Sequence, residues 1–255
     1  MVDVRSLTSG RTALLPLTNP VRRDSEEAFE PQSDPRHARG LALGWSDQGM
    51  IDAFEPMVTD ERRARLLHVL EGRLSAVTVL MDAPHDPHNG AAVLRTCEAL
   101  GIQHVHVIPR IEQFLAARVV TKGSDQWLDI AYHETPARAL SALKSHDYTV
   151  VGSHPEGELL PAQLRDMPRV AVVLGNEHAG ICAELERGID ARVRVPMRGF
   201  VESLNMSVSA AVLLANATNG RPGDLAPDER RRLYARWLLL SVPRSQEILE
   251  ALPPR

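Results

Sequence analysis

Short apolar runs alternate along most of the chain with longer stretches in which apolar residues recur at helical spacing. Five runs predict buried strands, at residues 76–82, 104–108, 148–152, 170–175 and 192–195. Four stretches among and after these runs predict helices, over residues 90–100, 136–145, from about 181, and over 207–216. Strands that alternate with helices predict an α/β domain with a mostly parallel sheet and helices on both of its faces.

The ends of the chain differ from this middle part. Residues 1–55 show no sustained periodicity and scatter Pro, Arg, Ser and Asp, whereas leucines recur at helical spacing between Thr59 and Leu74. We therefore expect residues 1–55 to form an N-terminal extension that is partly disordered or packed on the surface. Residues 56–220 are expected to form the main domain, and residues 221–255 a helical C-terminal extension.

Composition narrows the class of protein. A chain of 255 residues with 44% hydrophobic residues can bury a full core. It has no apolar run near the roughly 20 residues of a membrane span, and its N-terminus lacks the apolar centre of a secretory signal, so a cytoplasmic protein without a membrane partner is expected. Cys97 and Cys182 fit small core residues, and two cysteines exclude a disulfide framework or a cysteine-rich zinc site.

The net charge of −4 does not exclude a nucleic-acid partner, because binding depends on where the charges lie. Arginines cluster over residues 61–73 and 228–237. The candidates for contacts with RNA phosphates are Arg62, Arg63, Arg230 and Arg231. Solvated helix faces remain the alternative explanation of both clusters.

Three loops after predicted strands combine Gly or Pro with polar side chains, and such loops carry the ligand site in parallel α/β sheets. The first, DAPHDPHNG, leads into a helix with Asn89 near its start and Arg95 further along. A helix N-terminus suits a phosphate, which Arg95 could hold through two hydrogen bonds. His85, His88 and Asp86 suggest a metal, but the spacing offers no third strong ligand, so no metal is predicted.

The second and third loops leave a structural and a functional interpretation open. In GNEHAG, Gly175 marks a close backbone approach beside Glu177, or a plain turn with a solvated carboxylate. In PMRGFVESLN, Ser203 and Asn205 precede an Ala-rich helix that should be buried, so they either cap that helix or line a pocket. The dinucleotide, P-loop and serine-hydrolase signatures are absent from the sequence.

The three loops and their flanks resemble the three motifs of the SpoU (TrmH-like) RNA 2′-O-methyltransferases. The matching segments are DAPHDPHNGAAVLRTCEALG, VVLGNEHAGI and VPMRGFVESLNMSVSAAVLLAN, in the family's order and separation. The similarity runs from about Thr59 to about Arg236. HDPHN, SDQWLDI and LYARW further resemble the branch that methylates tRNA guanosine rather than the ribosomal-RNA branch.

The resemblance implies an α/β domain with a deep trefoil knot over residues 170–216, in a homodimer whose two subunits contribute to each site. It implies S-adenosylmethionine as the methyl donor and S-adenosylhomocysteine as the product. The groups expected around the cofactor are Ser153, His154, Leu174, Gly175, Asn176, Val195, Pro196, Met197, Ser203 and Leu204.

The implied reaction is methylation of a ribose 2′-hydroxyl of tRNA, at the D-loop guanosine 18. The residues implied in catalysis are Arg95, Asn89, Glu177, Ser203 and Asn205. Because an arginine stays protonated at neutral pH, we interpret Arg95 as a cation that stabilises the developing alkoxide rather than as a base. Two alternatives stand beside this: a ribosomal-RNA target, and a non-catalytic RNA-binding protein, which would have no chemical need of Arg95, Glu177 and Asn205.

Overall fold

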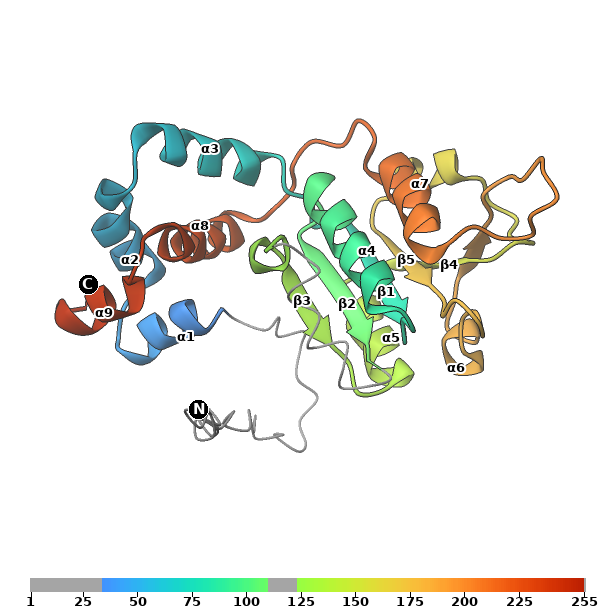
Figure 1. The fold of residues 1–255 in the computed structure, drawn as a ribbon, viewed down its shortest axis with the longest axis horizontal. Helices are drawn as coiled ribbons and strands as arrows, with labels where there is room; N and C mark the ends of the chain where they lie inside the picture. Colours follow the sequence, from blue (N-terminus) through green and yellow to red (C-terminus); the bar gives the residue numbers. More distant parts are fainter. Residues whose placement is uncertain (1–33, 110–122, 255) are drawn as a thin grey trace, which may run out of the picture.

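The computed structural model describes residues 34–109 and 123–254, and it contains one parallel six-stranded sheet (Figure 1). The strand order is β3-β2-β1-β5-β4-β6, and every neighbouring pair is parallel. The strands are β1 (Val77–Asp82), β2 (His104–Ile108), β3 (Asp129–Tyr132), β4 (Thr149–Ser153), β5 (Val170–Leu174) and β6 (Ala191–Val193). The predicted α/β fold with a mostly parallel sheet is confirmed, and β3 is the strand that the apolar pattern missed.

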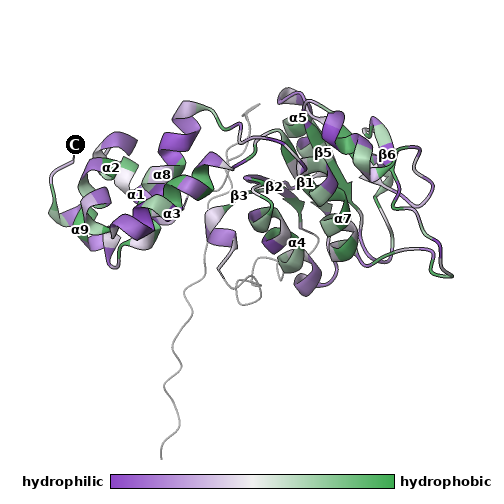
Figure 2. Cartoon of the chain, turned by 90° about the horizontal axis from the view of Figure 1, so that it is seen from above, coloured by the Kyte–Doolittle hydropathy of each residue, from purple (hydrophilic) through white to green (hydrophobic). Residues whose placement is uncertain are grey.

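Helices cover both faces of the sheet, as the alternation predicted. The helices α4 (Pro87–Ala99) and α7 (Met206–Thr218) cover one face, and α5 (Pro136–Ser145) lies on the other (Figure 2). The short helix α6 (Ala183–Glu186) packs on the same side as α5. In β1, Val79 and Met81 pack toward α4 and α7, whereas Leu80 packs toward α5. Because each face is covered, whole strands are buried, and each buried aliphatic side chain contributes roughly 1.5–3 kcal/mol.

A second hydrophobic core lies in a separate helical unit at one end of the molecule, on the left in Figure 1. Its helices are α1 (Pro35–Ala42), α2 (Asp47–Phe54), α3 (Asp60–Glu71), α8 (Pro227–Ser241) and α9 (Ser245–Ala251). Phe54 and Met50 of α2 are fully buried there, with Trp237 and Leu238 of α8. We refer to these five helices as the helical unit.

The helical unit revises the expected extension over residues 1–55. Residues 35–54 form two eight-residue helices, capped by Asp34 and Ser46, that join a core instead of lying on a surface. Two short helices carry too few turns for a period to be recognised in the sequence. The expectation for residues 1–33 falls outside the described residues. The described residues also form the short 3-10 helices η1 (Glu55–Met57), η3 (Asp125–Trp127) and η4 (Pro161–Asp166).

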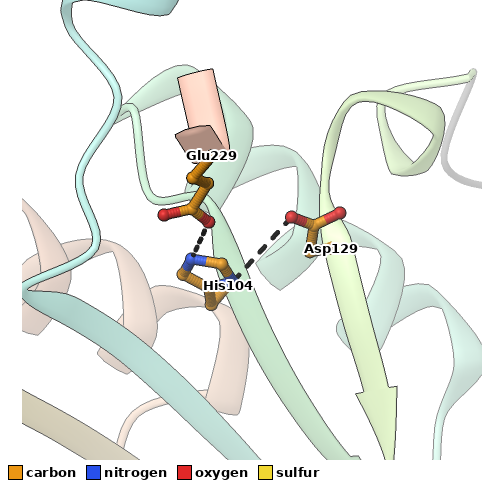
Figure 3. A group of neighbouring side chains, drawn as sticks. All are labelled: His104, Asp129 and Glu229. Atoms are coloured by element: carbon orange, nitrogen blue, oxygen red, sulfur yellow. Dashed lines mark ion pairs between the residues drawn. The ribbon is translucent and has the colours of Figure 1, made fainter. Parts of the chain in front are cut away.

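A buried charged cluster joins the helical unit to the amino-terminal edge of the sheet. Asp129, the first residue of β3, is fully buried and accepts hydrogen bonds from Arg232, at 2.7 Å, and from Arg236, both on α8. Beside it, His104 at the start of β2 lies 2.8 Å from a carboxylate oxygen of Glu229 (Figure 3). Burial alone would raise the pKa of Asp129, but Arg236 and Arg232 outweigh it and hold the pKa well below its ordinary range.

The two cysteines differ in burial. Cys97 is buried in the main core, where desolvation raises the pKa of its thiol to about 12, and it fits the predicted core role. Cys182 is also a free thiol but is only half-buried, at the N-cap of α6.

Among residues 34–109 and 123–254, no helix has the length and hydropathy needed to cross a membrane.

Candidate functional site

The three loops singled out in the sequence meet at the carboxyl edge of the sheet. The first follows β1, and Asp86 ends it by capping α4, accepting from the backbone N–H of His88 at 2.8 Å. The second follows the neighbouring strand β5. The third leads from β6 to α7, and Asn205 caps α7 by accepting from the N–H of Ser207 at 2.8 Å. Helix capping, one of the two interpretations left open for Asn205, is therefore present.

A chain of hydrogen bonds links all three loops. Glu177 accepts from the side-chain amide of Asn89 at 2.8 Å and from the backbone N–H of His85 at 2.9 Å. Asn205 donates from its Nδ2 to the Oδ1 of Asn89 at 3.0 Å. Glu177, Asn89 and Asn205, which we call the amide chain, thus come from three separate motifs and hold one another. Glu177 is therefore not the solvated carboxylate of a plain turn.

The surroundings of Glu177 keep it charged without a cation. Partial burial would raise its pKa, but hydrogen bonds from Asn89 and from the backbone of His85 outweigh burial and lower it. Within the part of the chain that the structure describes, Glu177 forms no ion pair. Its negative charge is held by neutral donors alone, so it can organise the loops at neutral pH.

The turn at Gly175 leaves no room for a side chain, because the backbone of the same turn passes close to it. A Cβ on Gly175 would lie 2.4 Å from the carbonyl carbon of Gly180, so no larger residue fits there. Asn176 is buried, donates to the carbonyl of Ala83 at 2.6 Å, and accepts from the N–H of His178 at 2.9 Å. The side chain of Asn176 therefore ties the second loop to the first.

The other residues expected around the cofactor line the same edge. Ser153 ends β4 and pairs with Val193, and the N–H of the adjacent His154 donates to the carbonyl of Val193 at 3.0 Å. Leu174, at the end of β5, is buried in the core. Val195, Pro196, Met197 and Leu204 lie in the segment between β6 and α7, and hydrogen bonds among the described residues use none of the backbone N–H groups of residues 195 and 197–204. This row of free donors is the feature of the edge best suited to a ligand.

Arg95 and Ser203 stand apart from the amide chain. Arg95 lies on the exposed face of α4 together with His88 and Ala92, and Ser203 is exposed in the third loop. Neither side chain makes a hydrogen bond or ion pair with any residue in 34–109 or 123–254. Of the five predicted catalytic residues, the fold brings three into contact and leaves these two facing outward.

The predicted RNA-binding arginines all lie on the helical unit, at the edge of the sheet opposite the three loops. Arg62 is half-buried, donates to the hydroxyl of Ser241 at 3.1 Å, and lies 5.4 Å from the centre of the Trp127 ring. The remaining three are exposed: Arg63 pairs with Asp60 at 3.0 Å, Arg231 pairs with Asp228 at 3.0 Å, and Arg230 forms no ion pair with a described residue.

Two features of the structure escaped the residue patterns. Arg65 is exposed on α3 and forms no ion pair with a described residue, although only its neighbours were singled out. The rings of His85 and His178 are in edge-to-face contact across the first and second loops, with centroids 4.8 Å apart. The presence of a histidine in each of two polar loops was the available signal for this contact.

A metal was not predicted, and the described residues contain one group whose ligand atoms converge, namely His104, Asp129 and Glu229. Both oxygens of Asp129 already accept hydrogen bonds from arginines. Two guanidinium groups beside the carboxylate oppose a cation there. We therefore describe the group as part of the junction between the helical unit and the sheet.

Comparisons with known proteins agree with the motifs. Residues 76–215 match the model of the SpoU rRNA Methylase family. A tRNA (guanosine(18)-2′-O)-methyltransferase of Thermus thermophilus is 32% identical over 71% of this chain and 97% of the relative. A 23S rRNA (guanosine-2′-O-)-methyltransferase of Bordetella pertussis is 33% identical over 72% of this chain and 75% of the relative.

Solved structures share the fold. The TrmH/SpoU tRNA modifying enzyme of A. aeolicus superposes with a TM-score of 0.62 at 25% identity, over 72% of this chain and 98% of that one. The SpoU methyltransferase AviRb of Streptomyces viridochromogenes, solved with the cofactor AdoMet, gives a TM-score of 0.52 at 23% identity, over 59% of this chain and 60% of that one.

Proposed function

The chain belongs to the SpoU rRNA methylase family, and we propose that it transfers a methyl group from S-adenosylmethionine to a ribose 2′-hydroxyl of tRNA. The proposed target is the D-loop guanosine 18, and S-adenosylhomocysteine is the product. The observation that carries this proposal is the amide chain, in which Glu177, Asn89 and Asn205 join the three motif loops at one edge of the sheet. The choice of tRNA rests on the similarity to the Thermus enzyme over nearly its whole length.

The carboxyl edge offers groups that fit the cofactor. S-adenosylmethionine, when bound, supplies a methyl group on a sulfonium, which a nucleophile can attack. The loops after β4, β5 and β6 flank the segment 195–204, whose backbone N–H groups are free to bind a carboxylate or an adenine ring. The side chains of Ser203 and Met197 lie on this segment too. Recognition by backbone groups agrees with the absence of a glycine-rich fingerprint in the sequence.

Side chains of this protein are proposed to bind the RNA phosphate, stabilise the developing charge and position the 2′-hydroxyl. Asn89 and Glu177 fix the start of α4, whose first N–H groups already donate to the side chain and carbonyl of Asp86, so the helix N-terminus is not the phosphate site that the sequence suggested. In this proposal the exposed side chain of Arg95 contacts a phosphate of the RNA and stabilises the negative charge that develops on the 2′-oxygen. Ser203 and Asn205 position the hydroxyl for attack in line with the methyl group.

We extend the proposal to a homodimer formed through the third loop and α7. Phe200 is fully exposed in that loop, and Val201 of the loop and Val208 of α7 are also exposed. The sequence of α7 contains no charged residue, and such a helix is normally covered on all sides. A partner subunit would cover these side chains and could complete the surroundings of Arg95 and Ser203, which lack contacts within one described chain.

The deep trefoil knot over residues 170–216 is likewise a proposal. Its support is the path of the chain, in which α7 packs back against η4 and β5 after β6 has paired with β4 at the edge of the sheet. A knotted segment would hold the loops after β5 and β6 close together.

The test is a methylation assay with labelled S-adenosylmethionine and two unmodified transcripts, a tRNA and a fragment of 23S rRNA. We expect label in the tRNA, mapped to the 2′-oxygen of guanosine 18, and dimers by light scattering at micromolar concentration. Ribosomal RNA is the second candidate because of the similarity to the Bordetella enzyme. Label in the 23S fragment alone would replace the tRNA assignment, and no label in either RNA with folded protein would contradict the proposed reaction.

A further inference from the structure

Two exposed histidines face each other beside the amide chain. His85 belongs to the loop after β1 and His178 to the turn after β5, and their ring planes meet at 81° with centroids 4.8 Å apart. Neither ring has a hydrogen-bond partner among residues 34–109 and 123–254. We refer to them as the histidine pair.

The backbones that carry the pair are fixed. The N–H of His85 donates to Glu177 at 2.9 Å, and the N–H of His178 donates to the side chain of Asn176 at 2.9 Å. Asn176 is itself buried and bonded to the first loop. The loops therefore hold two aromatic rings toward solvent at a set distance, without using the polar atoms of those rings.

We propose that the histidine pair is the platform on which the base of the target nucleotide stacks when its ribose enters the site. This inference rests on the proposed function. Sequence-specific proteins that bind single-stranded RNA stack unpaired bases on flat side chains, histidine included. In an edge-to-face pair one ring presents its edge to the other, so a ring face remains open to a third planar group. The pair adjoins Glu177, which places such a base next to Asn89 and Asn205.

Two other roles for the pair are less consistent with the contacts. A metal would need a further ligand, but Asp86 caps α4 and Glu177 accepts from three N–H groups of the first loop and α4. A purely structural role would be expected to bury the rings, and both are exposed. A proton-transfer role remains chemically distinct from stacking, and the substitutions below separate the two.

The experiment compares His85→Ala, His178→Ala and His178→Phe with the wild type, and uses His88→Ala as the matched control. His88 is an exposed histidine at the start of the same helix and has no ring contact in the described structure. Single-turnover methylation is measured at limiting tRNA. Stacking predicts that each alanine in the pair lowers the rate on the order of tenfold, whereas phenylalanine retains most of it. Affinity for S-adenosylmethionine should stay unchanged in all variants.

A second readout reports stacking without turnover. In a tRNA transcript with 2-aminopurine in place of guanosine 18, the wild type and His178→Phe should quench the fluorescence on binding, and the two alanine variants should not. Unchanged rates and unchanged quenching in the alanine variants would overturn the platform. A His178→Phe variant that fails to quench the probe and is as slow as His178→Ala would also overturn it, because stacking requires only a flat ring. If His178→Phe quenches the probe but is as slow as His178→Ala, stacking is supported and the lost rate belongs to proton transfer by the imidazole.

The two readouts separate this inference from the proposed function. A wild type that quenches the probe but methylates no tRNA would contradict the proposed reaction while supporting the platform. A wild type that neither binds nor quenches the probe transcript would overturn both.

Discussion

Two polar networks lie at opposite edges of the same parallel sheet, and they differ in burial and in the groups that bind their carboxylates. At the amino-terminal edge, Asp129 is completely buried and both of its oxygens accept from arginines of α8. At the carboxyl edge, Glu177 is partly exposed and is held by amide and backbone donors, with no ion pair among the described residues.

The burial and the partners of each carboxylate decide what its network can do. A buried carboxylate between two guanidinium groups is costly to disturb, because losing one partner leaves an uncompensated charge away from water. This cluster therefore ties the helical unit to the sheet. A carboxylate held by neutral donors at an open edge keeps its loops in place and leaves room for a ligand, which agrees with preorganised sites in enzymes.

The largest effect is expected at the buried cluster. Asp129→Asn removes the negative charge between Arg232 and Arg236, and we expect the free energy of unfolding to fall by about 3–5 kcal/mol. Urea denaturation provides the measurement. Asp228→Asn is the control, because the Asp228–Arg231 pair is exposed and should change stability by less than about 1 kcal/mol. Equal effects of the two substitutions would contradict the structural role of Asp129.

The same variant makes a prediction about pH. Because the pKa of Asp129 is lowered in the folded protein, its contribution is complete above the unfolded pKa of about 4 and is lost as pH falls through the lower, folded value. The difference in stability between wild type and Asp129→Asn should thus be constant from about pH 8 to pH 5. A difference that disappears already at pH 5 would show that the carboxylate is not held by the arginines.

The next largest effect is expected at Arg95, on turnover and not on stability. Arg95→Lys keeps a cation but loses the planar group that can bridge a phosphate and a hydroxyl. Single-turnover methylation should fall by on the order of a hundredfold or more. The affinity for S-adenosylmethionine and the urea midpoint should barely change, because the side chain makes no contact within the described chain. Rates like those of the wild type would remove Arg95 from the proposed chemistry.

The smallest effect concerns RNA affinity and divides the arginines of the helical unit. Arg65 and Arg230 are exposed and unpaired among the described residues, so Arg65→Ala and Arg230→Ala should each flatten the slope of log K for tRNA against log salt by about one. Arg62→Ala should instead lower stability with the slope unchanged, because Arg62 packs on Trp127 and Ser241. If the slope is unchanged in Arg65→Ala and Arg230→Ala, these two arginines do not contact phosphates and belong to solvated helix faces.

The sequence predicted the sheet better than the helical unit, for physical reasons. Uninterrupted apolar runs reveal strands that are buried on both faces, and Thr59 and Thr135 mark helix starts by their capping side chains. The strand β3 was missed because it has four residues and begins with Asp129, whose burial depends on two arginines that lie about 100 residues further along. Only the fold reveals that partnership.

The candidate site shows a similar division. Loops that follow parallel strands meet at one edge of the sheet. The sequence could therefore predict that Asn89, Glu177 and Asn205 lie close together. Periodicity could not indicate that Arg95 points outward, or that Arg62 packs on Trp127 and Ser241. Both depend on which side of a helix faces a neighbour, and the neighbours come from distant parts of the chain.

Single-turnover methylation of a tRNA transcript by Asn89→Ala and by Asp129→Asn, each corrected for its folded fraction, distinguishes the roles of the two networks. Asn89 connects Glu177 to Asn205, so its loss should reduce the rate at least tenfold while stability changes little. Asp129→Asn should methylate at nearly the wild-type rate per folded molecule. A wild-type methylation rate in Asn89→Ala would contradict the catalytic role of the amide chain. Loss of methylation in folded Asp129→Asn would contradict a purely structural role of the buried cluster.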